Sequence, residues 1–355
     1  MPAVSDIVWS AQATTPGAIE EALRAMLKER HSENASYVPA RTLNLVCIVD
    51  KQWSGEIANR LRGVGRSHAA RTIVCAVEPR RTAIDAVATI ASDVHPKPGE
   101  FALLRETVIV DVGEQHLPHL DTLVDPLVVT DLPTVVWAPH GHHEAVDALL
   151  ALVQVVLVDS VDEPDMREAL TRVQMLLDHV YVVDLAWLRS TPWRERVAAT
   201  FDTPHLRPDL QTISAVTIRH HPESAVAGLL LIGWLASRLD WRLSPLMDGG
   251  GGKLMGSASG RRQDVRVTLE PSPELQVRGL DGLTLETASG RHFDLDRGPG
   301  GLQAYYRNAK GQERRWVVLG ASRGEPGILG EGIRQALLRD PTYTPALGAA
   351  CALVR

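Results

Sequence analysis

The sequence has little cysteine and few aromatic residues, and both scarcities restrict what the chain can be. Its three cysteines, Cys47, Cys75 and Cys351, lie far apart and form no C-x-x-C pair. This pattern excludes a disulfide scaffold and an all-cysteine zinc site, and it favours a reducing compartment. Aromatic residues make up 5% of the chain, yet 8 are tryptophan and only 3 are phenylalanine. The imbalance points to specific tryptophan positions, in the core or at an interface.

The sequence also lacks an excess of positive charge and a long apolar run. The formal net charge is −6, so no general positive field draws the chain to nucleic acid or anionic lipid. The longest apolar run, residues 225–236, falls short of the ~20 residues of a membrane span. The amino terminus has neither the basic nor the apolar region of a signal peptide, so we expect a cytoplasmic protein. A length of 355 residues predicts two domains.

Strands and helices alternate through the first half of the sequence. Apolar, β-rich runs at residues 42–49 and 71–77 are typical of strands buried on both faces. A helix is predicted over residues 16–30, where Thr14 or Thr15 can cap the first turn. Further strands are predicted at residues 101–112, 134–137, 153–158 and 180–185, and further helices at residues 54–61, 117–127, 144–152 and 164–178. This alternation predicts an α/β domain with a mostly parallel sheet over residues 1–185.

The pattern changes after about Trp187. Residues 213–218 form a predicted strand, and residues 222–239 a strongly apolar helix. Short alternating segments separated by glycine-containing turns then fill residues 264–319, which is typical of an antiparallel sheet. Residues 248–252 are expected to form a flexible turn, and a last helix is expected over residues 328–339. We therefore predict a C-terminal α+β domain over residues 186–355.

None of the sequence motifs associated with catalysis is complete. Residues 320–324 match the G-x-S-x-G nucleophile elbow, but Pro326 interrupts the helix that must follow, and no histidine comes after Ser322. The glycine run 249–253 ends in lysine, but Leu254 stands where a phosphate loop needs a hydroxyl. No G-x-G-x-x-G follows a predicted strand. The sequence therefore predicts no enzyme and no bound cofactor.

Histidines gather at His140, His142 and His143, next to Glu144. Imidazoles two residues apart can chelate a metal in an extended loop. However, the cluster has no cysteine partner and no H-E-x-x-H helix, and it follows the loop-forming sequence Trp-Ala-Pro. We interpret it as a solvated loop and predict no metal site.

Residues 184–202 (DLAWLRSTPWRERVAATFD) form the most specific stretch of the chain. Ser190 or Thr191 can cap a helix there, and Trp193, Val197 and Phe201 share one face of it. The stretch resembles the signature of the glucose-6-phosphate dehydrogenase assembly protein family, OpcA, of actinobacteria and cyanobacteria. Other segments resemble the same family in the same order, at residues 41–49, 67–77, 131–139, 233–241 and 329–343. The chain departs from the family pattern at Ala69 and Ala138.

The resemblance implies a non-enzymatic role. Such a protein binds glucose-6-phosphate dehydrogenase, favours its active oligomer and thereby supports the oxidative pentose phosphate pathway. Aromatic and arginine side chains dominate interface energetics, so they are the partner-binding candidates. We expect Arg189, Arg194 and the Tyr305–Tyr306 pair to be exposed. The full candidate set is Trp137, Trp187, Arg189, Trp193, Arg194, Tyr305 and Tyr306.

An alternative of another class is a sugar-phosphate or nucleotide binding protein. Parallel α/β sheets bind such ligands in the crevice at the carboxyl ends of their strands. Asp50, Arg71 and Asp159 are the candidate ligand contacts for this alternative.

Overall fold

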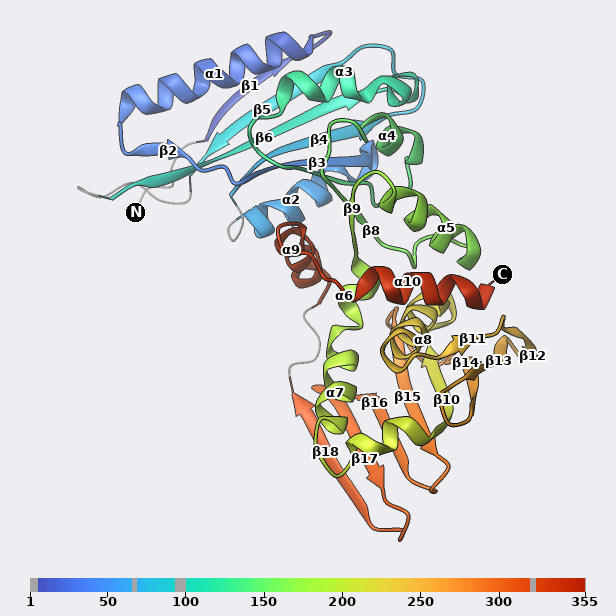
Figure 1. The fold of residues 1–355 in the computed structure, drawn as a ribbon. Helices are drawn as coiled ribbons and strands as arrows, with labels where there is room; N and C mark the ends of the chain where they lie inside the picture. Colours follow the sequence, from blue (N-terminus) through green and yellow to red (C-terminus); the bar gives the residue numbers. More distant parts are fainter. Residues whose placement is uncertain (1–5, 66–68, 93–99, 320–323, 355) are drawn as a thin grey trace. The chain divides into compact units, whose positions relative to one another are not determined.

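The computed structural model describes residues 6–65, 69–92, 100–319 and 324–354, which divide into two compact units (Figure 1). The first unit comprises Met1–Val158, His179–Val183 and Leu329–Leu337. The second comprises Asp159–Asp178, Asp184–Ile328 and Leu338–Arg355. Each unit is built from segments that are distant in sequence. Whether the chain folds as independent domains divided near residue 185 stays a prediction.

A sheet of nine strands forms the centre of the first unit. Its strands run in the order β1-β5-β6-β4-β3-β7-β8-β9, with β2 beside β6. The pairs β6/β4, β4/β3, β3/β7 and β7/β8 are parallel, whereas β1/β5 and β5/β6 are antiparallel. The bounds are β1 Ile7–Ala11, β2 Tyr37–Pro39, β3 Leu43–Asp50, β4 Ala70–Val77, β5 Asp85–Ala91, β6 Ala102–Val112, β7 Thr134–Trp137, β8 Val155–Val158 and β9 Tyr181–Asp184. The predicted α/β class with a mostly parallel sheet is confirmed.

The order β6-β4-β3-β7-β8-β9 is that of a doubly wound Rossmann-type sheet, in which the strand order reverses beside the first parallel strand. The reversal lies between β3 and β7. Both strands are buried throughout except for Asp50 at the end of β3, which explains their continuous apolar sequences. Strands β1 and β5 extend the sheet on one side and were not predicted.

The helices of the first unit follow their local sequence signals. The Thr15 hydroxyl caps α1 (Pro16–Glu33), which buries Ile19, Leu23 and Met26. Residues 117–127 were predicted as one helix, but Pro118 and Pro126 divide this segment into 3₁₀ turns and the short α3 (Leu120–Val124). The remaining helices are α2 Ser54–Gly65, α4 His143–Ala148 and α9 Gly324–Ala336, which spans the boundary between the units.

A second sheet of nine strands forms the centre of the second unit. Its order is β11-β13-β14-β10-β15-β16-β17-β18, with β12 beside β13, and among the described strands of this sheet every pairing except β10/β14 is antiparallel. The bounds are β10 Ile213–His220, β11 Arg242–Leu243, β12 Met247–Gly250, β13 Lys253–Ser259, β14 Asp264–Pro271, β15 Leu280–Thr287, β16 His292–Gly298, β17 Gly301–Arg307 and β18 Glu313–Leu319. The predicted antiparallel sheet is confirmed. Residues 248–252, expected to be only a turn, complete the hairpin β12–β13.

Helix α8 (Ala225–Leu239) packs across one face of the second sheet. A side chain at Gly228 would collide with Leu269 of β14, so the helix lies directly on the strands. Gly233 likewise allows α10 (Tyr343–Cys351), which was not predicted, to approach the other side of α8. The other helices of this unit are α5 Met166–Leu177, α6 Leu185–Arg189 and α7 Thr191–Phe201. Among the described residues, no helix is both long and apolar enough to cross a membrane.

Candidate functional site

The carboxyl ends of β3 and β7 form the place where a Rossmann-type sheet ordinarily binds its ligand. Asp50 ends β3, and its backbone N–H donates to Nδ1 of His140 at 3.0 Å. One Asp50 carboxylate oxygen lies 2.9 Å from Nε2 of His142. Trp53 stands beside His140, with ring centroids 6.5 Å apart. These residues therefore contact one another at the carboxyl ends of the strands.

The residues at these strand ends do not form a cradle for a pyrophosphate. A dinucleotide site uses a glycine-rich turn so that the backbone can approach the phosphates at a helix amino terminus. Here the turn is Asp50-Lys51-Gln52-Trp53, and Glu56 adds a carboxylate to the first turn of α2. Nor does the described part of the chain contain a group of three or more His, Cys, Asp or Glu side chains that could hold a metal.

We expect acidification to weaken the link between Asp50 and His140. Burial lowers the pKa of His140 from its ordinary value, against the opposing charge of Asp50. Because the pKa of His140 is lower in the folded chain than in the unfolded chain, protonation of His140 favours the unfolded chain. The contribution of neutral His140 to folding stability is therefore present above the unfolded-state pKa of about 6.5 and is lost as the pH falls below that value. The protection factor of the Asp50 amide in hydrogen exchange should therefore fall with pH. Constant protection of this amide, relative to the Val74 amide, would contradict the expectation.

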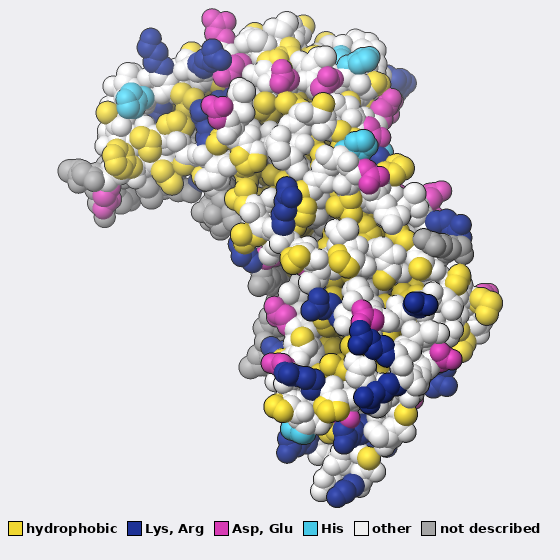
Figure 2. Space-filling view, in the orientation of Figure 1, with side chains coloured by type: hydrophobic (Ala, Val, Ile, Leu, Met, Phe, Trp, Pro, Cys, Tyr) yellow, Lys and Arg dark blue, Asp and Glu magenta, His cyan; other side chains and the backbone are white. Residues whose placement is uncertain are grey.

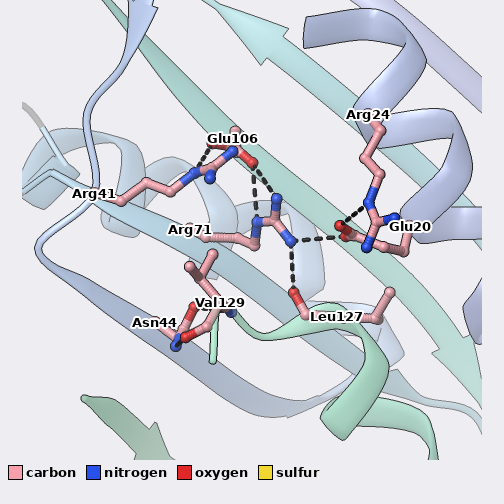
Figure 3. A network of polar contacts seen from close by, with 8 residues as sticks. All are labelled: Glu20, Arg24, Arg41, Asn44, Arg71, Glu106, Leu127 and Val129. Carbon is pink, nitrogen blue, oxygen red and sulfur yellow. Dashed lines mark hydrogen bonds and ion pairs between the residues drawn. The ribbon is translucent and has the colours of Figure 1, made fainter. Parts of the chain in front are cut away.

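Arg71 lies near the amino end of β4, whereas the ligand crevice lies at the carboxyl ends of the strands, so its assignment to that crevice is wrong. Its polar contacts are drawn in Figure 3. It is the second residue of β4 and is 2% exposed. Its guanidinium bonds the Glu106 carboxylate at 2.8–2.9 Å and the Glu20 carboxylate at 2.7 Å. It also donates to the carbonyl of Leu127 at 2.9 Å. Arg71 therefore holds β4, β6 and α1 together.

The most specific sequence stretch builds a buried cluster in the second unit. Trp187 on α6 is 2% exposed, and its indole N–H donates to Asp340 at 2.8 Å. The guanidinium of Arg194 on α7 stacks 3.5 Å above the Trp187 ring, and the Tyr343 ring packs beside it at 5.4 Å. Burial lowers the pKa of Arg194 to about 10. The expectation that Arg194 is exposed is therefore wrong, since it stacks on a buried tryptophan.

Asp184 anchors the same cluster. Its carboxylate accepts hydrogen bonds from the Ser160 hydroxyl at 2.7 Å, the Tyr343 hydroxyl at 2.9 Å and the Ala186 N–H at 2.9 Å. Burial and the charge of Asp159 raise the pKa of Asp184, although the hydrogen bonds from Ser160 and Tyr343 oppose the shift. The carboxylate caps α6 and ties it to α10, so its role in this unit is structural.

The remaining tryptophan and arginine candidates also lie within the fold. Trp193 is 3% exposed on α7, and Trp137 is 5% exposed on β7 of the first unit. Arg189 is half-buried and forms a bidentate pair with Asp159 at 2.6 and 2.8 Å. Asp159, a candidate of the nucleotide alternative, is thus engaged by an arginine. The hydrolase-like Ser322 lies outside the described residues.

The second sheet has a face that none of the described helices covers. The registers place the buried Val216, Leu285 and Phe293 on the face that α7 and α8 cover. On the other side, which we call the open face, they align Thr217, Thr284, Asp294, Tyr305 and Arg315 across five neighbouring strands. Most side chains of the open face are exposed or half-buried.

A chain of polar contacts crosses the open face. Arg219 pairs with Asp296 at 2.5 Å and donates to the Thr284 hydroxyl at 3.0 Å. Asp294 accepts from Thr284 and lies 2.5 Å from Nε2 of His292. The His292 ring meets the Tyr305 ring edge-on at 6.0 Å. The open face is therefore an ordered polar surface.

Exposed apolar side chains lie at both ends of the open face. Met247 and Met255 face each other across β12 and β13 and are 72% and 41% exposed. At the other end, Val317 on β18 is 55% exposed, and Trp316, which points to the opposite face, is 36% exposed. Tyr305 and Tyr306 on β17, which were expected to be exposed, are half-buried, and of the two Tyr305 is the one on the open face. The polar residues alternating through residues 264–296 could have identified this face from the sequence.

Two family models match the chain along most of its length. Residues 62–175 match the N-terminal domain, and residues 180–347 the C-terminal domain, of the glucose-6-phosphate dehydrogenase subunit, OpcA. A Nostoc punctiforme protein with the provisional name OxPP cycle protein OpcA is 32% identical over 130 residues, which are 36% of this chain and 28% of that protein. A Synechococcus elongatus protein of the same name is 29% identical over 39% of this chain and 32% of its own length. The chain thus matches only about a third of these relatives.

Solved structures give a more distant likeness. A WlbA dehydrogenase from Thermus thermophilus superposes with a TM-score of 0.46 and 12% identity, over 88% of this chain and 94% of that chain. A scyllo-inositol dehydrogenase from Lactobacillus casei gives 0.44 and 11%, over 89% and 96%. At these TM-scores and sequence identities, the similarity to the two dehydrogenases gives no information about the functional site of this chain.

Proposed function

Because the chain belongs to the OpcA family of glucose-6-phosphate dehydrogenase subunits, we propose that it is a non-catalytic subunit that binds this dehydrogenase through the open face of its second sheet. The family names also link it to the oxidative pentose phosphate pathway. Binding to the dehydrogenase would favour the active form of that enzyme. The chain would work in the cytoplasm, where this pathway supplies NADPH.

The observation that carries the proposal is the helix-free open face. Exposed apolar and aromatic side chains on an ordered polar surface can serve as the anchors of an interface. Here Met255 and Val317 lie at the two ends of an ordered polar sheet surface, and Tyr305 lies near one of them. Tyrosine combines a large apolar ring with a polar tip, which suits a contact surface.

A non-catalytic activator must act through a difference in affinity. It shifts the dehydrogenase toward the active oligomer only by as much as it binds that form more tightly than the inactive one. A coupling free energy of about 1–3 kcal/mol would shift the balance roughly 5- to 150-fold. The activation should therefore saturate with the concentration of the chain and be greatest at limiting dehydrogenase.

The test combines the purified chain with the glucose-6-phosphate dehydrogenase of the same organism. We expect co-elution in gel filtration and higher dehydrogenase activity at limiting enzyme. Unchanged activity together with separate elution would refute the proposal. Calorimetry of the chain alone with glucose 6-phosphate and with NADP(H) tests the ligand-binding alternative, which a saturable heat would support.

Replacing Tyr305 by alanine should weaken this complex. Loss of a contact aromatic is expected to raise the Kd by about tenfold, or ~1.4 kcal/mol. Calorimetric titration of the dehydrogenase measures the effect. The control is Trp53→Ala, which removes a 46% exposed aromatic from the first unit. Equal affinities for the two variants would contradict the placement of the contact on the open face.

A further inference from the structure

Strand β18 ends the second sheet, and no described strand pairs with its outer edge (Figure 1). It runs antiparallel to β17, with Tyr305 opposite Arg315. At the connecting turn, the Asn308 N–H donates to the Gln312 carbonyl at 3.0 Å. Hydrogen-bonded and non-hydrogen-bonded pairs alternate along an antiparallel ladder. Counting from this pair, the backbone N–H and C=O groups of Glu313, Arg315 and Val317 point away from β17.

The side chains along this edge change character from one end to the other. The Arg315 side chain is 78% exposed, with its guanidinium 5.2 Å from the centroid of the Tyr305 ring. Arg314 is exposed on the other face of the strand. Trp316 and Val317 follow, and both are exposed apolar side chains. The strand therefore presents two cations and then two apolar side chains.

We propose that the outer edge of β18 receives an extended segment of the dehydrogenase as an additional strand. The segment would place carboxylates opposite Arg314 and Arg315 and apolar side chains opposite Trp316 and Val317. Main-chain hydrogen bonds give affinity in such β-strand addition, and side chains at alternate positions give specificity. This inference rests on the proposed function, since it specifies how the same partner is held.

Charge favours an acidic segment as the occupant. The hairpin β17–β18 carries Arg307, Arg314 and Arg315 against one carboxylate, Glu313, although the whole chain has a net charge of −6. Figure 2 shows several Lys and Arg side chains on the visible face of the second unit. A second copy of the chain would bring the same arginine cluster against itself, and like charges on neighbouring strands repel.

A proline at position 317 tests the strand addition. Val317→Pro removes an N–H that points away from β17, so the ladder within the sheet is retained. We expect the Kd for the dehydrogenase to rise by about tenfold or more. The matched control Val317→Ile keeps the N–H and the β-branched apolar side chain, and it should bind like the wild type. Circular dichroism and the unfolding midpoint establish that both variants fold.

A charge reversal tests whether the added segment carries carboxylates opposite Arg314 and Arg315. Arg315→Glu should also weaken the complex by about tenfold and remove part of its salt dependence. Lys28→Glu makes the same change of charge at an exposed position on α1 and should leave the affinity unchanged. In hydrogen exchange of the wild-type complex, the amides of Arg315 and Val317 should become protected.

The possible failures are distinguishable. If the wild-type chain binds the dehydrogenase while Val317→Pro and Arg315→Glu bind equally well, the edge inference is overturned and the proposed function stands. If Val317→Pro abolishes self-association of the chain but not the complex, the occupant is a second copy, which also overturns the inference. If the wild-type chain forms no complex, both proposals fail together.

Discussion

Trp187→Ala is expected to lower the free energy of unfolding of the second unit by about 3–5 kcal/mol. The substitution opens a cavity beside Tyr343, removes the ring on which Arg194 stacks and leaves Asp340 without its indole donor. Hydrogen bonds from Thr342 and Trp187 and the charge of Arg194 lower the pKa of Asp340 although burial opposes the shift, so the carboxylate depends on these partners. Hydrogen exchange of amides in β10 and β14 under urea assigns the loss to this unit.

One further variant separates packing from polar contacts at position 187, and a variant in the first unit serves as the control. Trp187→Phe keeps a ring for Arg194 but has no N–H for Asp340. Its loss of unfolding free energy should therefore be clearly smaller than that of Trp187→Ala. Trp53→Ala, at a 46% exposed position in the first unit, should change stability by less than about 1 kcal/mol. A loss for Trp187→Ala no larger than that for Trp53→Ala would show that the cluster does not hold α6, α7 and α10 together.

Arg71→Met should destabilise the first unit by a similar amount, about 3–5 kcal/mol. The guanidinium is the shared partner of Glu106 and Glu20, and Glu106 is 1% exposed. Removing only the cation leaves the buried Glu106 carboxylate with Arg41 as its remaining ion-pair partner. Urea unfolding followed by exchange of amides in β4 and β6 measures the loss.

The comparison with Arg24→Met isolates the effect of burial. Arg24 pairs with the same Glu20 at 3.0 Å, but its side chain is 77% exposed. Exposed pairs contribute about 0–1 kcal/mol, so this variant should be nearly neutral. The double variant Arg71→Met/Glu106→Leu should recover part of the loss, because no carboxylate then stays buried without Arg71. Equal losses for Arg24→Met and Arg71→Met would contradict the account.

Much of the fold could be predicted because its signals are local. Residues 42–49 and 71–77 are mostly apolar and β-branched, and the structure places them as the central strands β3 and β4. Thr15 caps α1 as its position before Pro16 indicates. Strands β1 and β5 were not predicted, because a short segment that adds to the side of a sheet draws its stability from the neighbouring strand.

The site could be predicted less well than the fold. Tryptophan and arginine side chains suit an interface and a core equally, and sequence spacing does not distinguish the two. Arg194 is buried because Trp187 lies under its guanidinium and Asp340 lies near it, and Asp340 is 153 residues beyond Trp187 in the chain. Tyr305 was identified as a surface candidate, but the open face around it combines five strands that only their registers bring together.

The α/β character, the two kinds of sheet and the incompleteness of every catalytic motif could all be predicted from the sequence. These properties depend on the composition and periodicity of short segments, which can be read without knowing what the segments pack against. By contrast, the tertiary fold was needed to show that Arg71 joins β4, β6 and α1, that the Trp187 cluster is buried and that none of the described helices covers one face of the second sheet. Burial and exposure depend on what distant segments pack against a side chain, and that information is spread over the whole chain.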